Sequence, residues 1–126
     1  MLILPIKKQW FDMILSGEKK EEYREIKPYY TKRFKNAGMF PDPLGINETH
    51  LILDPKNFRK YEIMFRNGYS SKSPSFIAKV YLTTDFGRAD WGAKPGVKYY
   101  TLHIVEIVST YKCNSSLKGK NYNDRV

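Results

Sequence analysis

Three stretches in the second half of the chain predict β-strands. Residues 61–66 (YEIMFR) and 76–82 (FIAKVYL) alternate apolar and polar residues, as strands with one buried face do, and 99–112 (YYTLHIVEIVSTYK) is the longest strand-like run. Asn67-Gly68 follows the first stretch and predicts a turn. The residues that share one face are Tyr61, Ile63 and Phe65 in the first stretch and Phe76, Ala78, Val80 and Leu82 in the second.

The first third of the chain predicts helices between short strands. Residues 1–6 (MLILPI) are apolar and suit a strand, and 7–16 (KKQWFDMILS) predict a helix with Gly17 at the position of a left-handed cap. Residues 20–26 (KEEYREI) lack helical periodicity and predict a second strand. A short second helix is expected to open near Pro28.

Glycine and proline residues interrupt the chain between Asn36 and Lys60, so we expect a loop-rich connection in which only 51–53 (LIL) can form a strand. Together these patterns predict an α+β fold, a small β-barrel of five or six mostly antiparallel strands with one or two helices packed beside it. The length suits a single domain, which we place over residues 1–113. Residues 114–126 form a polar tail with little apolar content.

The chain carries a net charge of +9, which favours polyanionic partners such as nucleic acid. Cys113 is the only cysteine, so an intramolecular disulfide and a thiolate metal cluster are excluded, which fits a reducing compartment. The first residues lack an apolar core of signal-peptide length, and no segment approaches a membrane span. We therefore expect a cytoplasmic protein that binds no membrane, with its oligomeric state open.

The patterns of several common chemistries are missing from the sequence. His50 and His103 are the only histidines and lack metal-ligand spacing, so neither a metal nor another cofactor is expected. His103 lies in the middle of a predicted strand, where a structural or surface role fits better. No GxSxG motif supports Ser-His-Asp catalysis, and Gly87, Gly92 and Gly96 are too widely spaced for a nucleotide-binding loop.

Aromatic and basic residues are interleaved along the chain, which is typical of surfaces that bind single-stranded nucleic acid. Trp91 lies in a loop close to Arg88 and predicts a stacking platform. Most aromatic residues are buried, and Trp10 and Phe11 are assigned to the core because they lie on the apolar face of the first helix. The interleaved residues are Tyr29, Tyr30, Phe34, Trp91, Tyr99 and Tyr100 with Lys27, Lys32, Arg33, Arg88, Lys94 and Lys98.

The charged stretch GEKKEEYRE, residues 17–25, follows the predicted helix directly. A charge run is usually a solvated turn. If 20–26 is a strand, however, Glu22 and Arg24 lie on one face, roughly 7 Å apart at the backbone, where their side chains can bond. The full alternation puts Lys20, Glu22, Arg24 and Ile26 on that face and Glu21, Tyr23 and Glu25 on the other.

Lys19 lies at the junction between the helix cap and this strand. A carboxylate beside Arg24 would orient the guanidinium for a phosphate or a planar base, with Lys19 as a point charge next to it. Tyr23 is turned away by the alternation, so we assign it to the core. The stretch therefore predicts one wall of a binding cleft.

The spacing Gly17-x-Lys19-x-x-Glu22-x-Arg24, preceded by WFDMILSG, resembles the G-x-K-x-x-E-x-R signature of the ASCH domain, a relative of the PUA-like β-barrels. The sequence Arg-Asn-Gly-Tyr at 66–69 and the late strand YYTLHIVEIV also resemble the family. The resemblance extends over roughly residues 1–111. It implies a PUA-like barrel with a cleft between barrel and helix that binds RNA or a modified nucleobase.

Some compact bacterial members of the family are amidohydrolases that remove an acyl group from N4-acetylcytidine. Their motif reads K-x-x-T-x-R, so Lys19 matches the catalytic lysine whereas Glu22 stands in place of threonine. A carboxylate next to a lysine raises the lysine pKa, against the requirement of a general base. The catalytic glutamate of those enzymes has no aligned position here, and Asp85 and Asp90 are only nearby candidates.

Three hypotheses follow for function. In the first, the protein binds RNA or a nucleotide through Lys19, Glu22 and Arg24. In the second, it is an enzyme that hydrolyses the amide of an acylated cytidine, or cleaves RNA, with Lys19 as the base and Glu22 beside it. In the third, it is an interaction module in which Glu22 and Arg24 form an internal ion pair. The further candidate ligand contacts are Lys20, Arg88 and Trp91.

Overall fold

A computed structural model describes residues 1–42 and 55–112 of the chain. This part of the chain has the α+β class and the two early helices that the sequence predicts, together with five strands. Its elements are β1 (Ile3–Ile6), α1 (Lys8–Leu15), β2 (Glu21–Glu25), α2 (Pro28–Asn36), the 3-10 helix η1 (Pro55–Asn57), β3 (Tyr61–Asn67), β4 (Ser75–Phe86), the 3-10 helix η2 (Ala89–Trp91) and β5 (Lys98–Tyr111).

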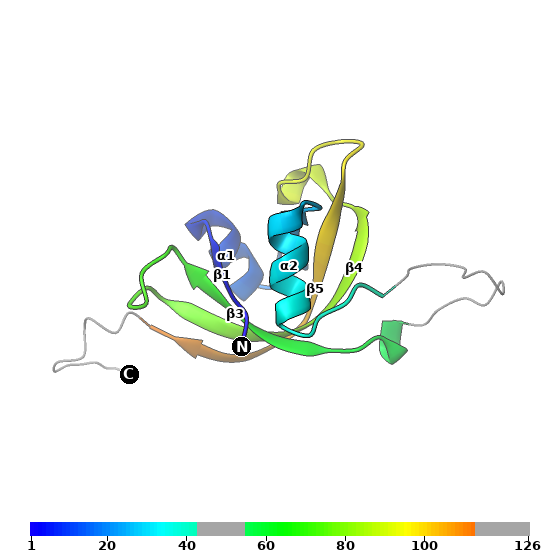
Figure 1. Cartoon of the computed structure of the whole chain (residues 1–126). Coiled ribbons are helices and arrows are strands. Elements are labelled where there is room, and N and C mark those ends of the chain that lie inside the picture. The colour runs from blue at the N-terminus through cyan, green and yellow to red at the C-terminus, as the bar shows by residue number, and fades with distance from the viewer. Residues whose placement is uncertain (43–54, 113–126) are drawn as a thin grey trace, which may run out of the picture.

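The strands form one mixed sheet in the order β1-β3-β4-β5-β2. β1 runs parallel to β3, and every other neighbouring pair is antiparallel. The sheet is strongly curved, and α1 and α2 both lie on its concave side (Figure 1). Strands that are distant in sequence therefore become neighbours. The two edge strands, β1 and β2, both come from the first fifth of the chain.

The prediction of a closed barrel is wrong for the described part of the chain. The edge strands β1 and β2 form no ladder with each other, so the curved sheet stays open between them. Pro5 lies on β1 and has no backbone N–H to donate, which restricts such a residue to a sheet edge. The carbonyl oxygens of Ile3 and Pro5 instead accept hydrogen bonds from Arg33 Nη2 at 2.9 Å and Arg24 Nη2 at 2.8 Å.

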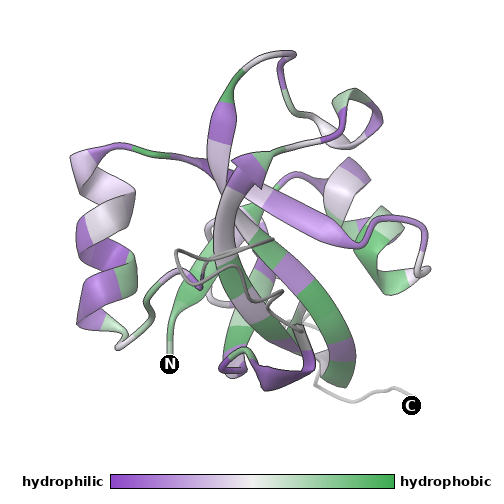
Figure 2. Ribbon diagram, turned by 90° about the vertical axis from the view of Figure 1, so that its right-hand side faces the viewer, coloured by the Kyte–Doolittle hydropathy of each residue, from purple (hydrophilic) through white to green (hydrophobic). Residues whose placement is uncertain are grey.

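The inward faces of the central strands follow the predicted alternation. Ile63 and Phe65 on β3 are buried, as are all four predicted residues of β4, and Tyr61 is partly buried against them. From the helices, Phe11, Ile14 and Phe34 pack onto this layer. Figure 2 shows hydrophobic and hydrophilic bands alternating along the strands, as expected for a sheet with one buried face. The buried residues of β4 are Phe76, Ala78, Val80 and Leu82.

Some predictions concern residues that the structure does not describe. The possible strand 51–53, His50, Cys113 and the polar tail 114–126 lie outside the described residues. Of the predicted loop-rich connection 36–60, the described ends contain the last residue of α2 and η1. In the described part of the chain, neither helix has the length and apolar character needed to cross a membrane.

The two phenylalanines Phe65 and Phe86 provide a matched test of this core. Phe65 is fully buried, whereas Phe86 is 54% exposed. We expect Phe65→Ala to lower the free energy of unfolding by about 3–5 kcal/mol because it leaves a cavity, and Phe86→Ala to change it by less than about 1 kcal/mol. Urea denaturation followed by tryptophan fluorescence measures both values. Equal effects of the two substitutions would contradict the described packing.

Candidate functional site

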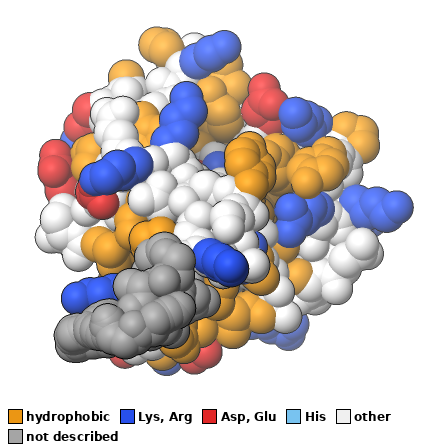
Figure 3. Space-filling view, turned by 90° about the vertical axis from the view of Figure 1, so that its left-hand side faces the viewer, with side chains coloured by type: hydrophobic (Ala, Val, Ile, Leu, Met, Phe, Trp, Pro, Cys, Tyr) orange, Lys and Arg blue, Asp and Glu red, His pale blue; other side chains and the backbone are white. Residues whose placement is uncertain are grey.

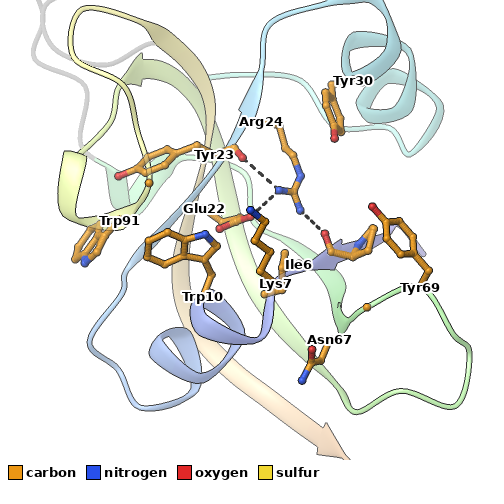
Figure 4. Close-up of a pocket in the computed structure, with 13 residues that line it drawn as sticks. Ile6, Lys7, Trp10, Glu22, Tyr23, Arg24, Tyr30, Asn67, Tyr69 and Trp91 are labelled. Atoms are coloured by element: carbon orange, nitrogen blue, oxygen red, sulfur yellow. Dashed lines mark hydrogen bonds and ion pairs between the residues drawn. The ribbon is translucent and has the colours of Figure 1, made fainter.

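A cleft of about 430 Å³ opens where the two edges of the sheet approach each other (Figure 4). Its walls come from β1, the start of α1, β2, the first turn of α2, the loop after β3 and the end of η2. Glu22 and Arg24 lie in the middle of this lining, with aromatic side chains on several sides. The volume is within the range of pockets that bind small molecules.

The turn that ends α1 places Lys19 at this site. Gly17 has φ of 86°, a left-handed conformation that a glycine adopts without strain. The backbone N–H of Lys19 then donates to the carbonyl oxygen of Met13 at 3.0 Å, which folds the chain back under the helix. The Lys19 side chain is completely buried as a result.

The buried Lys19 ammonium has polar and aromatic neighbours. Its Nζ donates to Glu22 Oε1 at 2.6 Å and also to the backbone carbonyl oxygen of Glu21. The rings of Trp10 and Tyr23 lie 5.3 Å and 5.1 Å from Nζ, measured to the ring centroids. An ammonium in this position is stabilised by its carboxylate partner and by the faces of both rings.

Glu22 joins Lys19 to Arg24. Its side chain is only 5% exposed, and its second oxygen, Oε2, accepts a hydrogen bond from Arg24 Nη1 at 2.6 Å. Arg24 also donates to the carbonyl oxygens of Tyr23 at 3.3 Å and of Pro5 at 2.8 Å. The predicted pairing of Glu22 and Arg24 on one face of the strand is therefore confirmed, and two cations share one buried carboxylate.

The pKa of Lys19 is lowered from its ordinary value, chiefly because burial disfavours the charged ammonium. Glu22 raises this pKa through its charge and its hydrogen bond, as we expected, but the effect of burial is larger. Arg24 lowers it further by like-charge repulsion. The environment therefore favours an uncharged Lys19 more than the sequence alone suggests.

Five aromatic side chains surround the charged centre of the cleft. Trp91, for which the sequence predicts a stacking role, lines the cleft and is mostly buried. The assignment of Trp10 to the core is wrong, because Trp10 is half-buried and lines the cleft. Gly92 permits this arrangement, since a Cβ there would lie 3.0 Å from the Trp10 ring. The five residues are Trp10, Tyr23, Tyr30, Tyr69 and Trp91.

Tyr23 and Tyr69 differ in how well the sequence predicts them. Tyr23 does share a face with Glu21, whose Oε1 accepts a hydrogen bond from the Tyr23 hydroxyl at 2.8 Å. It is only partly buried and contributes to the cleft, so its assignment to the core alone is wrong. Tyr69 is 88% exposed at the rim, and no functional role was assigned to it. The feature of the sequence that could have predicted a role for Tyr69 is its position directly after the Asn67-Gly68 turn.

Four of the other candidates lie outside the lining of the cleft. Lys20 is exposed, and it is Lys7, before α1, that contributes a cationic side chain to the lining (Figure 4). Arg88 lies over the Trp91 ring at 4.3 Å and pairs with Asp90 at 2.8 Å, so it contacts a lining residue without lining the cleft itself. Neither Asp90 nor Asp85 is among the lining residues.

His103 has the structural role that its position predicts. Its Nε2 lies 2.8 Å from Thr83 Oγ1, its Nδ1 lies 3.6 Å from Glu21 Oε2, and its ring stacks on Tyr81 at 4.3 Å. Thr83 is fully buried, so its hydroxyl cannot meet a substrate although the three groups resemble a catalytic triad. Within residues 1–42 and 55–112, no cluster of three or more His, Cys, Asp or Glu residues could hold a metal.

The lowered pKa of Lys19 predicts a pH dependence of stability. Because the folded protein holds a proton on Lys19 less tightly than the unfolded chain does, the stability contributed by Lys19 rises with pH until the ordinary value of 10.5 is passed. The difference in unfolding free energy between wild type and Lys19→Met should therefore increase as the pH rises towards 10.5. One proton limits the slope to about 1.4 kcal/mol per pH unit.

The exposed neighbour Lys20 provides the control for this measurement. Urea denaturation of wild type and Lys20→Met over the same pH range should give a constant difference. A constant difference for Lys19→Met as well would show that Lys19 is equally solvated in the folded and unfolded chains, which contradicts its burial.

Comparisons of the chain with family models, with curated proteins and with solved structures found no match. The resemblance to the ASCH domain therefore rests on the residues of the motif and stays a prediction.

Proposed function

We propose that this protein binds RNA or a nucleotide in the cleft built on Lys19, Glu22 and Arg24. The observation that carries the proposal is the Arg24 guanidinium, which is held in one orientation by Glu22 and Pro5 while it faces a cleft lined by aromatic rings. A fixed, planar guanidinium suits a phosphate or the polar edge of a base, and aromatic faces suit base stacking.

The charges of the site support an anionic or partly anionic ligand. Lys19, Glu22 and Arg24 leave one positive charge in excess when Lys19 is protonated, and Lys7 adds another at the lining. Figure 3 shows lysine and arginine side chains spread over one face of the molecule, with acidic side chains among them. Such a distribution attracts a polyanion over a distance while the cleft provides the specific contacts.

The aromatic lining favours an unpaired base over a duplex. Bases in a duplex are stacked on each other and cannot place a face against Tyr69, which is exposed, or Tyr30, which is partly buried in the lining. Single-stranded RNA can turn a base out and stack it on such rings. We therefore propose single-stranded RNA, or a nucleotide derived from it, as the ligand.

Lys7 and Lys8 provide a matched test of this proposal. Both are exposed, but only Lys7 lines the cleft, whereas Lys8 pairs with Asp12 at 2.6 Å on α1. We expect Lys7→Ala to weaken binding of a labelled single-stranded RNA and to reduce the slope of log affinity against log salt by about 0.7. Lys8→Ala should change neither quantity. Fluorescence anisotropy over a salt series measures both.

The outcome that would contradict the proposal is a wild-type protein that binds no RNA or nucleotide, or equal effects of Lys7→Ala and Lys8→Ala. Arg24 is a poorer first probe, because it also bonds β1 to β2 and its removal can lower affinity through loss of structure. A matched duplex in the same experiment should bind more weakly than the single strand.

The alternative function, hydrolysis of an acylated cytidine, has one observation in its favour. The lowered pKa of Lys19 is what a lysine general base requires. Against it, the Lys19 side chain is fully buried, its Nζ donates to Glu22 and Glu21, and Lys19 is absent from the cleft lining. Lys19 therefore needs a rearrangement of the site before it can accept a proton from a substrate or water.

Incubation with N4-acetylcytidine separates the two functions. If the protein only binds, no cytidine should form at any pH from neutral to mildly alkaline, and a labelled RNA in a parallel reaction should stay intact. Cytidine formed by wild type but not by a folded Lys19→Met variant would instead favour the hydrolase. Chromatography of the reaction mixture detects the product, and circular dichroism checks the fold of the variant.

A further inference from the structure

A second hollow, of about 680 Å³, lies along the same edge of the sheet as the cleft. Its lining includes Leu2, the residue before β1, and Tyr29, Lys32 and Arg33 on α2. The cleft is lined by Pro5 and Ile6 near the end of β1 and by Tyr30 on α2. The two hollows are therefore neighbours along one strand and one helix.

The distance between the hollows excludes a single base as the occupant of both. Leu2 directly precedes β1 and Pro5 lies on it, and three residues of extended backbone span roughly 10 Å. The rise per nucleotide in one strand of a stacked nucleic acid is about 3.4 Å. A ligand that fills both hollows must therefore be longer than one nucleotide.

Tyr29 and Tyr30 connect the two hollows through their rings. The ring centroids are 4.9 Å apart, and the rings meet edge to face at 81°. Arg24 and Lys27 lie over the Tyr30 ring at 5.9 Å and 5.6 Å, and Arg33 lies over the Tyr29 ring at 5.8 Å. Aromatic faces and cations therefore alternate from the cleft to the second hollow.

Arg33 holds the exposed ring of Tyr29 in a defined position. Tyr29 is 57% exposed, so most of its surface is available to a ligand. Arg33 Nη1 donates to the Tyr29 hydroxyl at 3.2 Å, and Arg33 Nη2 is itself fixed on the carbonyl oxygen of Ile3 at 2.9 Å. An isolated surface tyrosine needs no explanation. A tyrosine fixed by an anchored arginine beside a hollow provides a preorganised stacking surface.

The charges of the second hollow fit a phosphate backbone. Lys32 and Arg33 contribute two positive charges to its lining, and Glu62 contributes one negative charge. Two of the five N–H donors of Arg33 are occupied by Tyr29 and Ile3, so its guanidinium retains donors for a phosphate oxygen. This is the combination of ring and cation found where single strands bind.

We propose that the second hollow binds another nucleotide of the strand whose first nucleotide lies in the cleft, with its base on Tyr29 and its phosphate at Lys32 and Arg33. The ligand of the protein is then a single-stranded oligonucleotide of at least two nucleotides, which binds more tightly than a mononucleotide. This inference rests on the proposed function of the cleft.

Calorimetry with two sets of probes tests the proposal. The probes are the four ribonucleoside 5′-monophosphates and the four corresponding homotetranucleotides. For wild type, the best tetranucleotide should bind more tightly than the best monophosphate. Tyr29→Ala should weaken tetranucleotide binding at least fivefold, the lower end of the effect of one stacked base, and should leave monophosphate binding unchanged.

Two further variants make the result specific. Tyr111→Ala removes a tyrosine that is similarly exposed at the far end of β5 and lines neither hollow, so it should leave tetranucleotide affinity unchanged. Lys32→Ala should reduce the salt dependence of tetranucleotide binding, with a log-log slope smaller by about 0.7.

Each outcome bears on one of the two proposals. In one outcome, Tyr29→Ala binds tetranucleotides as wild type does, while Lys7→Ala weakens binding of both kinds of probe. The proposal for the cleft then holds, and the proposal for the second hollow is overturned. A Tyr29→Ala variant that loses monophosphate binding as well would also overturn it, because Tyr29 would then act on the cleft itself. If wild type binds neither kind of probe, the proposed function fails and the inference fails with it.

Discussion

The Arg24 guanidinium joins the two edges of an open sheet. One of its nitrogens bonds Glu22 on the same strand, and the other bonds the carbonyl oxygen of Pro5 on β1, which is not a neighbour of β2 in the sheet. In a closed barrel, backbone hydrogen bonds would connect these strands. Here a side chain makes the connection, so the gap between the edges can hold a cleft and the cleft contains a fixed cation.

The burial of Lys19 and Glu22 beneath this arginine is difficult to explain by stability alone. Removing a lysine and a carboxylate from water costs several kcal/mol per ion, and their attraction recovers this only with good geometry and further hydrogen bonds. The structure supplies both, since Glu22 uses its two oxygens for two cations and Lys19 has a carbonyl oxygen in addition. The result is a rigid charge arrangement, because any rotation of Glu22 would leave a buried cation without its partner.

The sequence predicts well whatever depends on local periodicity. The helix over 7–16, its end at Gly17 and the pairing of Glu22 with Arg24 follow from spacings within a few residues, and the structure has all three. Closure of the barrel depends on whether β1 meets β2, which no local pattern determines. Trp10 shows the same limit, because helical spacing defines an apolar face but the docking angle of α1 decides which part of that face meets the core.

Within the candidate site, the charged centre could be predicted and most of the aromatic rim could not. Lys19, Glu22 and Arg24 belong to one short motif, whereas Trp10 and Tyr69 come from separate segments that only the folded chain brings together. Arg88 is close to Trp91 in sequence and in space, yet it lies outside the lining and its guanidinium pairs with Asp90. Contacts with a ligand depend on the direction of a side chain as well as on its position in the sequence.

The division between buried centre and exposed rim has a consequence for how the site can change in evolution. A substitution at Glu22 or Arg24 alters the fold and the cleft together, since both side chains take part in the contacts between strands. Tyr69 and Lys7 are exposed and can be exchanged at little cost to the folded state. Related chains could thus acquire different ligand preferences through drift at the rim, whereas a single substitution at the centre leaves a buried charge without its partner and is selected against.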